Sequence, residues 1–297
     1  MEDLLLIGGS NVDYIGRSDT KLIKKVSNIG TITISFGGVI RNTTENLLRI
    51  GNKCNLLTAI GDDLYGNKLK EYMISLGVNL ICPKTKYPSA TYLAINDESN
   101  DMALGICDNR IMDDLNSKFI DQNKELILKH KYIIIDSNLS SEVIDYLFDN
   151  FKDQKFICEG ISPSKVIKYR KHLNEIFLLK CNIHEAQALI NIELVERDLV
   201  GALLVKGIKN VVVSNRSDDI YYGSNNRDIG MVHVDEIKEF KNTTGCGDAL
   251  FSGVIDYFIQ GHNLKESVAF GNKLAAITLN TYQATNEEIS SLYYEHK

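Results

Sequence analysis

The chain has 297 residues, enough for a substantial buried core and typical of an α/β unit with a small appendage. Lys plus Arg number 33 and Asp plus Glu 39, and the resulting net charge of −6 argues against nucleic-acid or anionic-lipid partners and favours a small molecule. The six cysteines lack metal-ligand spacing, and no apolar stretch approaches the roughly 20 residues of a membrane span. No basic region precedes the first apolar run, so we expect a cytoplasmic protein with reduced thiols.

Short apolar runs alternate with helical patterns along the chain. Continuous apolar runs are typical of strands buried on both faces of a parallel sheet, and we predict such strands at 4–7, 54–59, 132–135, 156–158, 177–179 and 211–213. Helical spacing of apolar residues predicts helices at 43–50, 67–76, 142–151 and 183–190. The repeated order of strand and helix indicates an α/β fold with a central, mostly parallel sheet flanked by helices.

Two regions, 13–36 and 89–107, break this alternation. Within them, 31–34 and 90–94 have the pattern of half-exposed strands, and we predict a small β-lid over the main sheet. The lid would be inserted into a single domain of residues 1–297, whose core comprises approximately 1–12, 37–88 and 108–297. Exposed lid strands are natural pairing edges, so we expect a homodimer formed through the lid.

A glycine-rich turn at 242–248 is followed at once by an amphipathic helix that ends near Gly261. Free backbone N–H groups at a helix N-terminus can hold an anion, and glycines let the backbone approach a phosphate closely. Asp248 places a proton acceptor beside such a site, as phosphoryl transfer requires. The alternative is that Asp248 only complements the helix dipole and the glycines only form a turn.

The segment 244–248 resembles the C-terminal signature of the ribokinase-like (PfkB) carbohydrate kinases. Residues 36–42 with 45–47 and 51, continued by 61–63 and 66, resemble the N-terminal signature of that family. Two signatures in the correct order, about 200 residues apart, are much harder to obtain by chance than either alone. The resemblance implies a ribokinase-like fold that transfers the γ-phosphoryl group of ATP with Mg²⁺; parts of the family also use a monovalent cation such as K⁺.

Within the family, the pattern Gly37-Gly38-Val39-x-Arg41-Asn42 is similar to the form found in pseudouridine kinases, and further similarity occurs at 27–30, 136–140, 169–173 and 266–268. The resemblance therefore implies phosphorylation of the 5′-hydroxyl of pseudouridine. Ribose, another nucleoside or a ketohexose are alternative acceptors. An alternative of a different class is a nucleoside- or sugar-binding protein of the same fold with impaired catalysis.

The resemblance also implies roles for individual residues. Asp248 would be the base, and the amides of Gly245, Cys246 and Gly247 would form the anion hole. The positions implied for the acceptor are Asn11, Asp13, Gly37, Gly38, Arg41, Asn42, Asp108 and Asn138. Asn42 with Glu45 also fits a helix capping box. Asn11, Asp13 and Asn138 also fit turns, and Asp108 also fits a solvated surface.

The positions implied for the nucleotide are Ser214, Asn215, Thr244, Gly245, Gly247 and Asn272. The loop at 214–219 departs from the family pattern, because Asp218 and Asp219 would oppose a phosphate. Asn182 and Glu185 match the N-x-x-E element associated with Mg²⁺ and would act through water, but they also fit a helix N-cap. Cys246 lies at a helix N-terminus, a position that lowers thiol pKa, so we hypothesise that it is oxidisable.

Overall fold

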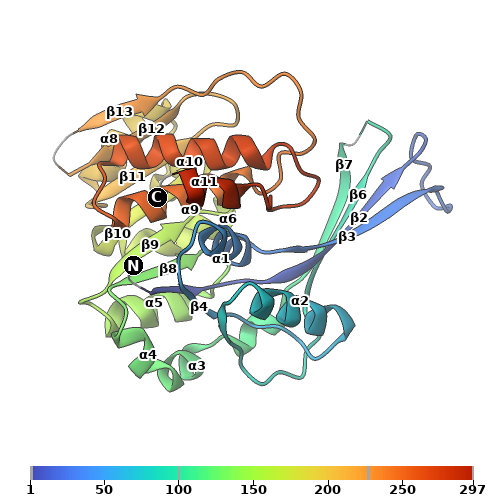
Figure 1. Cartoon of the computed structure of the whole chain (residues 1–297), viewed down its shortest axis with the longest axis horizontal. Helices are drawn as coiled ribbons and strands as arrows, with labels where there is room; N and C mark the ends of the chain where they lie inside the picture. The colour runs from blue at the N-terminus through green and yellow to red at the C-terminus, as the bar shows by residue number, and fades with distance from the viewer. Residues whose placement is uncertain (1–2, 100, 226–227, 296–297) are drawn as a thin grey trace.

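The computed structural model describes residues 3–99, 101–225 and 228–295. The predicted core and lid ranges extend beyond these at 1–2, 100, 226–227 and 296–297, which lie outside the described residues. A large sheet runs through the middle of the protein with helices on both faces, and a smaller sheet projects from one side (Figure 1). The predicted α/β fold with a central sheet and a second small sheet is confirmed.

The large sheet is mostly parallel. In the described residues its spatial order is β13 (Ile229–Val232), β12 (Ile220–Ser224), β11 (Asn210–Ser214), β10 (Ile176–Asn182), β9 (Lys155–Glu159), β8 (Tyr132–Asp136), β1 (Leu4–Ile7), β4 (Cys54–Leu57) and β5 (Asn79–Ile81). In the described residues its antiparallel pairs are β11–β12 and β12–β13, and its other pairs are parallel. The six predicted strands are confirmed, with boundaries shifted by at most three residues.

Apolar side chains on both faces of this sheet form two cores, each covered by helices. One face carries α1 (Val39–Arg49), α2 (Leu64–Ser75), α9 (Cys246–Ile259), α10 (Leu264–Thr278) and α11 (Ile289–Glu295). The other carries α3 (Ser117–Gln122), α4 (Lys124–Leu128), α5 (Ser141–Asn150), α7 (Ile183–Ile190) and α8 (Glu196–Val205). Short helices α6 (Pro163–Val166), η1 (Arg110–Asp114), η2 (Ile167–Lys171) and η3 (Leu173–Glu175) lie in connections. No helix among the described residues is long and apolar enough to cross a bilayer.

The small sheet has the order β3 (Gly30–Gly37), β2 (Asn11–Ser18), β6 (Ala90–Asn96) and β7 (Met102–Asp108). Its central pair is parallel and its outer pairs are antiparallel. Residues opposite one another in neighbouring strands share a face of a sheet. One such row contains the polar residues Ser35, Asp13, Tyr92 and Cys107, and the next row, on the opposite face, contains Ile34, Tyr14, Leu93 and Ile106.

The carboxyl ends of the parallel strands meet at one edge of the large sheet, where ligands of open α/β sheets bind. The register places Asp136 at the end of β8 beside Glu159 in β9, and Glu159 beside Lys180 in β10. Three ionisable residues are thereby aligned across this edge, next to the N-terminus of α9.

Candidate active site

The glycine-rich turn before α9 depends on a backbone conformation that favours glycine. Gly245 has φ of 82°, and a Cβ there would lie 1.8 Å from the backbone oxygen of Ala284. The first amides of a helix have no carbonyl one turn earlier to bind. Of these, the Cys246 amide makes a long hydrogen bond of 3.3 Å to the Thr243 carbonyl oxygen. The turn therefore presents the amides of Gly247 and Asp248 at the positive end of the α9 dipole.

Asp248 lies in the first turn of α9 and is buried. Its Oδ2 accepts a hydrogen bond of 2.7 Å from Nδ2 of Asn42, which α1 contributes from the opposite end of the chain. Burial raises the pKa of Asp248 to about 6, and the Asn42 hydrogen bond and the charges of Lys180 and Arg41 limit that rise. A carboxyl with a pKa near neutrality, beside free helix amides, suits a general base in group transfer.

Lys180 is a buried cation beneath this turn, and the sequence analysis did not identify it. Its Nζ donates to Oε1 of Glu159 at 2.5 Å and would lie 3.0 Å from a Cβ at Gly247. Burial alone would lower the pKa of Lys180, but the negative charges of Glu159 and Glu185 outweigh it and raise that pKa, so Lys180 stays protonated. The signal in the sequence was a lysine inside an otherwise apolar strand, because Lys and Glu are rarely buried unless paired.

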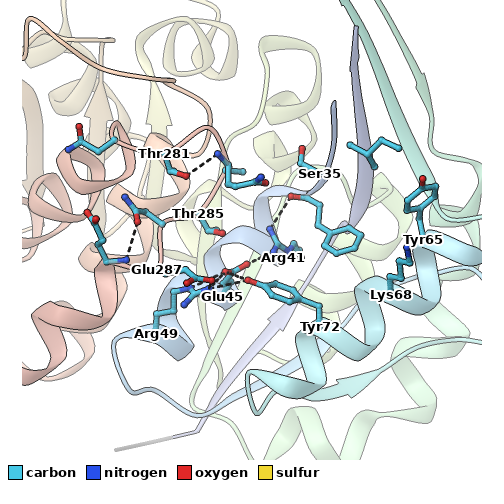
Figure 2. Close-up of a pocket in the computed structure, with 17 residues that line it drawn as sticks. Ser35, Arg41, Glu45, Arg49, Tyr65, Lys68, Tyr72, Thr281, Thr285 and Glu287 are labelled. Carbon is cyan, nitrogen blue, oxygen red and sulfur yellow. Dashed lines mark hydrogen bonds and ion pairs between the residues drawn. The ribbon is translucent and has the colours of Figure 1, made fainter. Parts of the chain in front are cut away.

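Arg41 connects Asn42 to a buried ionic cluster on α1. Its Nη1 donates to Oδ1 of Asn42 at 2.7 Å, and its Nη2 forms an ion pair with Glu45. Glu45 also accepts from Arg49 at 2.7 Å and from the Tyr72 hydroxyl at 2.6 Å. These four side chains converge in Figure 2. The cluster holds the guanidinium of Arg41 in place, and through it the amide of Asn42.

The same cluster forms one wall of a cavity of about 780 Å³ between α1, α2, β3 and the loop before α11 (Figure 2). Asn42 and Asp248 do not line this cavity. Arg41 therefore lies between the cavity and the Asn42–Asp248 pair, with an exposed fraction of only 3%. Its predicted direct contact with the acceptor remains a prediction, because in this structure its hydrogen bonds go to protein atoms.

Two capping interpretations have opposite outcomes. The capping box proposed for Asn42 and Glu45 is wrong, because α1 begins at Val39 and both residues lie inside the helix, where their side chains bind other partners. The cap proposed for Asn182 and Glu185 is confirmed, since the amide of each residue donates to the side chain of the other.

Asn11 and Asp13 lie in β2, so the turn interpretation of these two residues is wrong. The side-chain amide of Asn11 donates to the Asp13 carboxylate. Burial raises the pKa of Asp13 to about 6, opposed by the Asn11 hydrogen bond and the charge of Arg41. Gly37 leaves room for the Asp13 carboxylate, because a Cβ at Gly37 would lie 2.1 Å from Oδ2 of Asp13.

Asn138 follows β8 and is held by Asp136, a residue that the sequence analysis did not assign to the site. Oδ1 of Asp136 accepts from the Asn138 backbone at 2.9 Å, and Oδ2 accepts from the Asn138 side chain at 3.3 Å. Gly9 lies against this side chain, because a Cβ at Gly9 would be 3.2 Å from Nδ2 of Asn138. Burial raises the pKa of Asp136 to about 6.

Asp108 ends β7 and forms an exposed ion pair with Arg110, which donates to Oδ2 of Asp108 at 2.7 Å and to Oδ1 at 2.9 Å. These hydrogen bonds lower the pKa of Asp108 to about 2. Both carboxylate oxygens are thus engaged on the surface. The predicted contact of Asp108 with the acceptor stays a prediction, and this geometry does not favour it.

The residues predicted to bind the nucleotide lie on several separate elements. Nδ2 of Asn215 donates to Glu196 at 2.7 Å and to Asp218 at 2.8 Å. Ser214 ends β11 and Asn272 lies half-buried on α10, which packs against α9. Among the described residues, no hydrogen bond joins these side chains to the turn at 245–248. Thr244 is exposed, and its amide donates to Asn242 at 3.0 Å.

The acidic residues near the turn decide how this site could hold a magnesium ion. Among the described residues no group of three His, Cys, Asp or Glu side chains could hold a metal by itself. Glu185 is engaged by Asn182, whereas Oε2 of Glu159 is buried without a hydrogen-bond partner. This donor set fits a Mg²⁺ that is carried by nucleotide phosphates and keeps its waters.

The hypothesis that Cys246 is oxidisable is not supported by its environment. Burial and the neighbouring negative charge of Asp248 raise the pKa of the Cys246 thiol to about 11. The helix dipole alone would lower the pKa of this thiol, but desolvation of the thiolate dominates here.

The family model for pfkB family carbohydrate kinases matches residues 1–290. The chain therefore belongs to this family of kinases, which use ATP and Mg²⁺ to phosphorylate a sugar or nucleoside alcohol. It is 31% identical over 295 residues to the pseudouridine kinase of Escherichia coli, covering 97% of this chain and 93% of that protein.

Two further relatives extend this comparison. The guanosine-inosine kinase of Exiguobacterium acetylicum is 26% identical over 285 residues, covering 93% of this chain and 94% of that protein. A ribokinase from Thermotoga maritima has the same fold, with a TM-score of 0.85 at 20% identity, over 99% of this chain and 100% of that chain.

Proposed function

We propose that the chain transfers the γ-phosphoryl group of ATP to the 5′-hydroxyl of pseudouridine. The observation that carries the proposal is the buried Asp248, which Asn42 holds at the N-terminus of α9 and whose pKa is raised to about 6. The acceptor is supported by the 31% identity over nearly the whole length of a pseudouridine kinase.

In the proposed reaction, Asp248 accepts the proton of the 5′-hydroxyl as its oxygen bonds to the γ-phosphorus and the bond to ADP breaks. Asn42 orients the carboxylate toward the hydroxyl. The amides of Gly245, Cys246 and Gly247 stabilise the negative charge of the transferring group, with the Cys246 amide released from Thr243. The ammonium of Lys180 beneath Gly247 adds a fixed positive charge.

The nucleotide would extend from this turn toward Ser214, Asn215 and Asn272. Mg²⁺, when bound, would neutralise charge on the phosphates, with Asn182 and Glu185 acting through its waters. Asp218 does not have to face a phosphate, because it accepts from Asn215, and Asp219 accepts from His233 at 2.7 Å. The loop that departs from the family pattern thus has local partners for both carboxylates.

The acceptor would lie between the small sheet and the edge of the large sheet, with its ribosyl hydroxyls at Asn11 and Asp13. The similarity to a guanosine-inosine kinase makes another nucleoside the principal competing acceptor. Ribose and a ketohexose remain further alternatives. In the binding-protein alternative, ligand binds but turnover does not occur.

We further propose a homodimer that pairs through the exposed apolar face of the small sheet. Ile32, Leu104 and Ile106 on this face have exposed fractions of 74%, 52% and 56%.

We also place the reaction in the cytoplasm, since all six cysteines, each among the described residues, are free thiols, as in a reducing compartment.

The function is tested by ADP release with Mg-ATP and pseudouridine, uridine, guanosine, ribose or fructose, with and without K⁺. We expect the highest kcat/KM with pseudouridine. Asp248→Asn should reduce kcat by about a hundredfold to ten-thousandfold while pseudouridine still binds.

The matched control is Asp256→Asn, because Asp256 lies on the same helix, is buried and accepts from Asn52 at 2.8 Å. This control should retain turnover. Turnover that prefers another acceptor would discard pseudouridine alone, and binding without turnover in the wild type would favour the binding-protein alternative.

A further inference from the structure

Lys165 on α6 is a cation beside Asn138, one of the residues predicted for the acceptor. Its Nζ donates to Oδ1 of Asn138 at 2.7 Å, and among the described residues this is its only hydrogen bond. An ammonium group has three N–H donors and no acceptor, so two donors remain. The residue is half-buried, so it remains partly accessible to a ligand.

A continuous line of contacts connects Lys165 with Asp248. Asn138 lies against Gly9, and a Cβ at Gly38 would lie 2.5 Å from the Gly9 carbonyl oxygen. The Gly38 carbonyl in turn accepts from the Asn42 amide at 2.8 Å, and Asn42 binds Asp248. At Gly9 and Gly38 this line of contacts carries no side chain. A ribosyl acceptor along this line, with its 5′-hydroxyl at Asp248, would direct the group at C1′ toward Asn138 and Lys165.

The small sheet also contributes groups near Lys165. Burial raises the pKa of the Cys107 thiol in β7, and the nearby charges of Lys165 and Asp13 act on it in opposite directions. The register places Cys107 and Asp13 on one face of the small sheet. The group at C1′ would therefore lie between the polar face of the small sheet and the ammonium of Lys165.

The neighbouring Lys168 has a different environment. Its Nζ donates to the backbone oxygens of Ser137 at 3.0 Å and Leu139 at 2.8 Å. Lys168 thus fastens the loop that carries Asn138, and Lys165 is the neighbour that retains free donors. Asp136, which lies within electrostatic reach of both lysines, is buried and occupied by Asn138.

We propose that Lys165 is a specificity residue that donates a hydrogen bond to a carbonyl oxygen of the acceptor's base. This inference rests on the proposed function. The uracil ring of pseudouridine supplies such oxygens, whereas ribose carries only a hydroxyl at C1 and has no base carbonyl. Lys165 would thus favour nucleosides whose base is a pyrimidinedione over the free sugar.

The test compares kcat/KM for pseudouridine and ribose in Lys165→Met, which keeps an unbranched side chain one atom shorter and removes its donors. We expect a loss of about tenfold to a hundredfold with pseudouridine, the range for a charged hydrogen bond, and a change of less than about twofold with ribose. Lys165→Arg, which keeps a cationic donor, should restore part of the preference. Calorimetry should show weaker binding of pseudouridine to Lys165→Met.

Two lysine variants serve as controls. Lys168→Met should affect both acceptors equally, because it loosens the loop and removes no donor to the base. Lys171→Met should change neither, since Lys171 is 72% exposed and pairs with Asp145 on the surface.

The outcomes separate this inference from the proposed function. Suppose that the wild-type enzyme phosphorylates pseudouridine. If Lys165→Met then loses kcat/KM equally with both acceptors, or with neither, the role of Lys165 is overturned and the proposed function stands. A wild-type enzyme that phosphorylates ribose but no nucleoside would overturn this role and the proposed acceptor together, while the kinase class would stand.

Discussion

The ionisation of Asp248 depends on side chains from two distant parts of the chain, α1 and β10. Asn42 donates directly to its carboxylate, and the charges of Lys180 and Arg41 favour its ionised form. Burial opposes these three influences because it favours the neutral carboxyl, and the resulting pKa of Asp248 is about 6. Arg41 also binds the oxygen of Asn42, so the ionic cluster on α1 fixes which way the Asn42 amide points.

Asn42→Ala should move the acid limb of the kcat/KM profile to higher pH. The hydrogen bond from Asn42 stabilises the ionised carboxylate, so its removal raises the pKa of Asp248 further. A base must be ionised to act, so the variant should lose more activity near about pH 6 than near about pH 8. Steady-state kinetics across this range provide the measurement.

Asn52→Ala is the matched control, since Asn52 makes the equivalent bond to Asp256 on the same helix. Its profile should keep the wild-type midpoint. An unchanged midpoint in Asn42→Ala would argue that Asp248 is not the group that titrates.

At the scale of elements, α9 presents its N-terminus to the site because the preceding turn passes close to the loop before α11. The contact between Gly245 and the Ala284 backbone leaves no room for a side chain. α9 ends before a second glycine with positive φ, Gly261 at 96°, which has open space around it. The two glycines share a backbone requirement and differ in their surroundings.

This difference gives a paired prediction. Gly261→Ala introduces only backbone strain, so it should cost about 1 kcal/mol of unfolding free energy and leave kcat unchanged. Gly245→Ala adds a clash with backbone, so it should destabilise more and also reduce kcat by at least about tenfold. Denaturant unfolding and ADP release measure the two effects. Equal stability and activity of the two variants would contradict the tight packing of the turn.

At the scale of the whole molecule, the two faces of the small sheet have opposite character. The row through Asp13 and Cys107 is polar, whereas the row through Ile34 and Ile106 is apolar and exposed. A contiguous exposed apolar face marks an interaction surface in a soluble protein. The sheet projects from the main body, where a second copy can reach it (Figure 1).

Ile106→Lys should therefore shift the protein from dimer to monomer in analytical ultracentrifugation. The buried ammonium would find no partner in an apolar interface. Val205→Lys is the control, because Val205 ends α8 and is 87% exposed on the main body. A wild-type protein that is monomeric at all concentrations tested would exclude dimerisation through this face.

Local signals were sufficient for most of the large sheet. Continuous apolar runs identified its buried strands, and the spacing of Asn182 and Glu185 identified a true cap for α7. The same kind of signal failed for Asn42 and Glu45, where an equal spacing lies inside α1. Residue types alone cannot tell these cases apart, because the difference lies in the partners, Asp248 and Arg49, that the fold supplies.

The sequence by itself determined the α/β architecture, the glycine-rich turn before α9 and the family signatures, since each depends on neighbours along the chain. Only the tertiary structure placed Asn42 against Asp248, Lys180 beneath Gly247, and Lys165 against Asn138. These placements depend on which strands pair and where their ends meet. The pKa of Asp248 is likewise a tertiary property, because desolvation and distant charges set it and no local pattern records either.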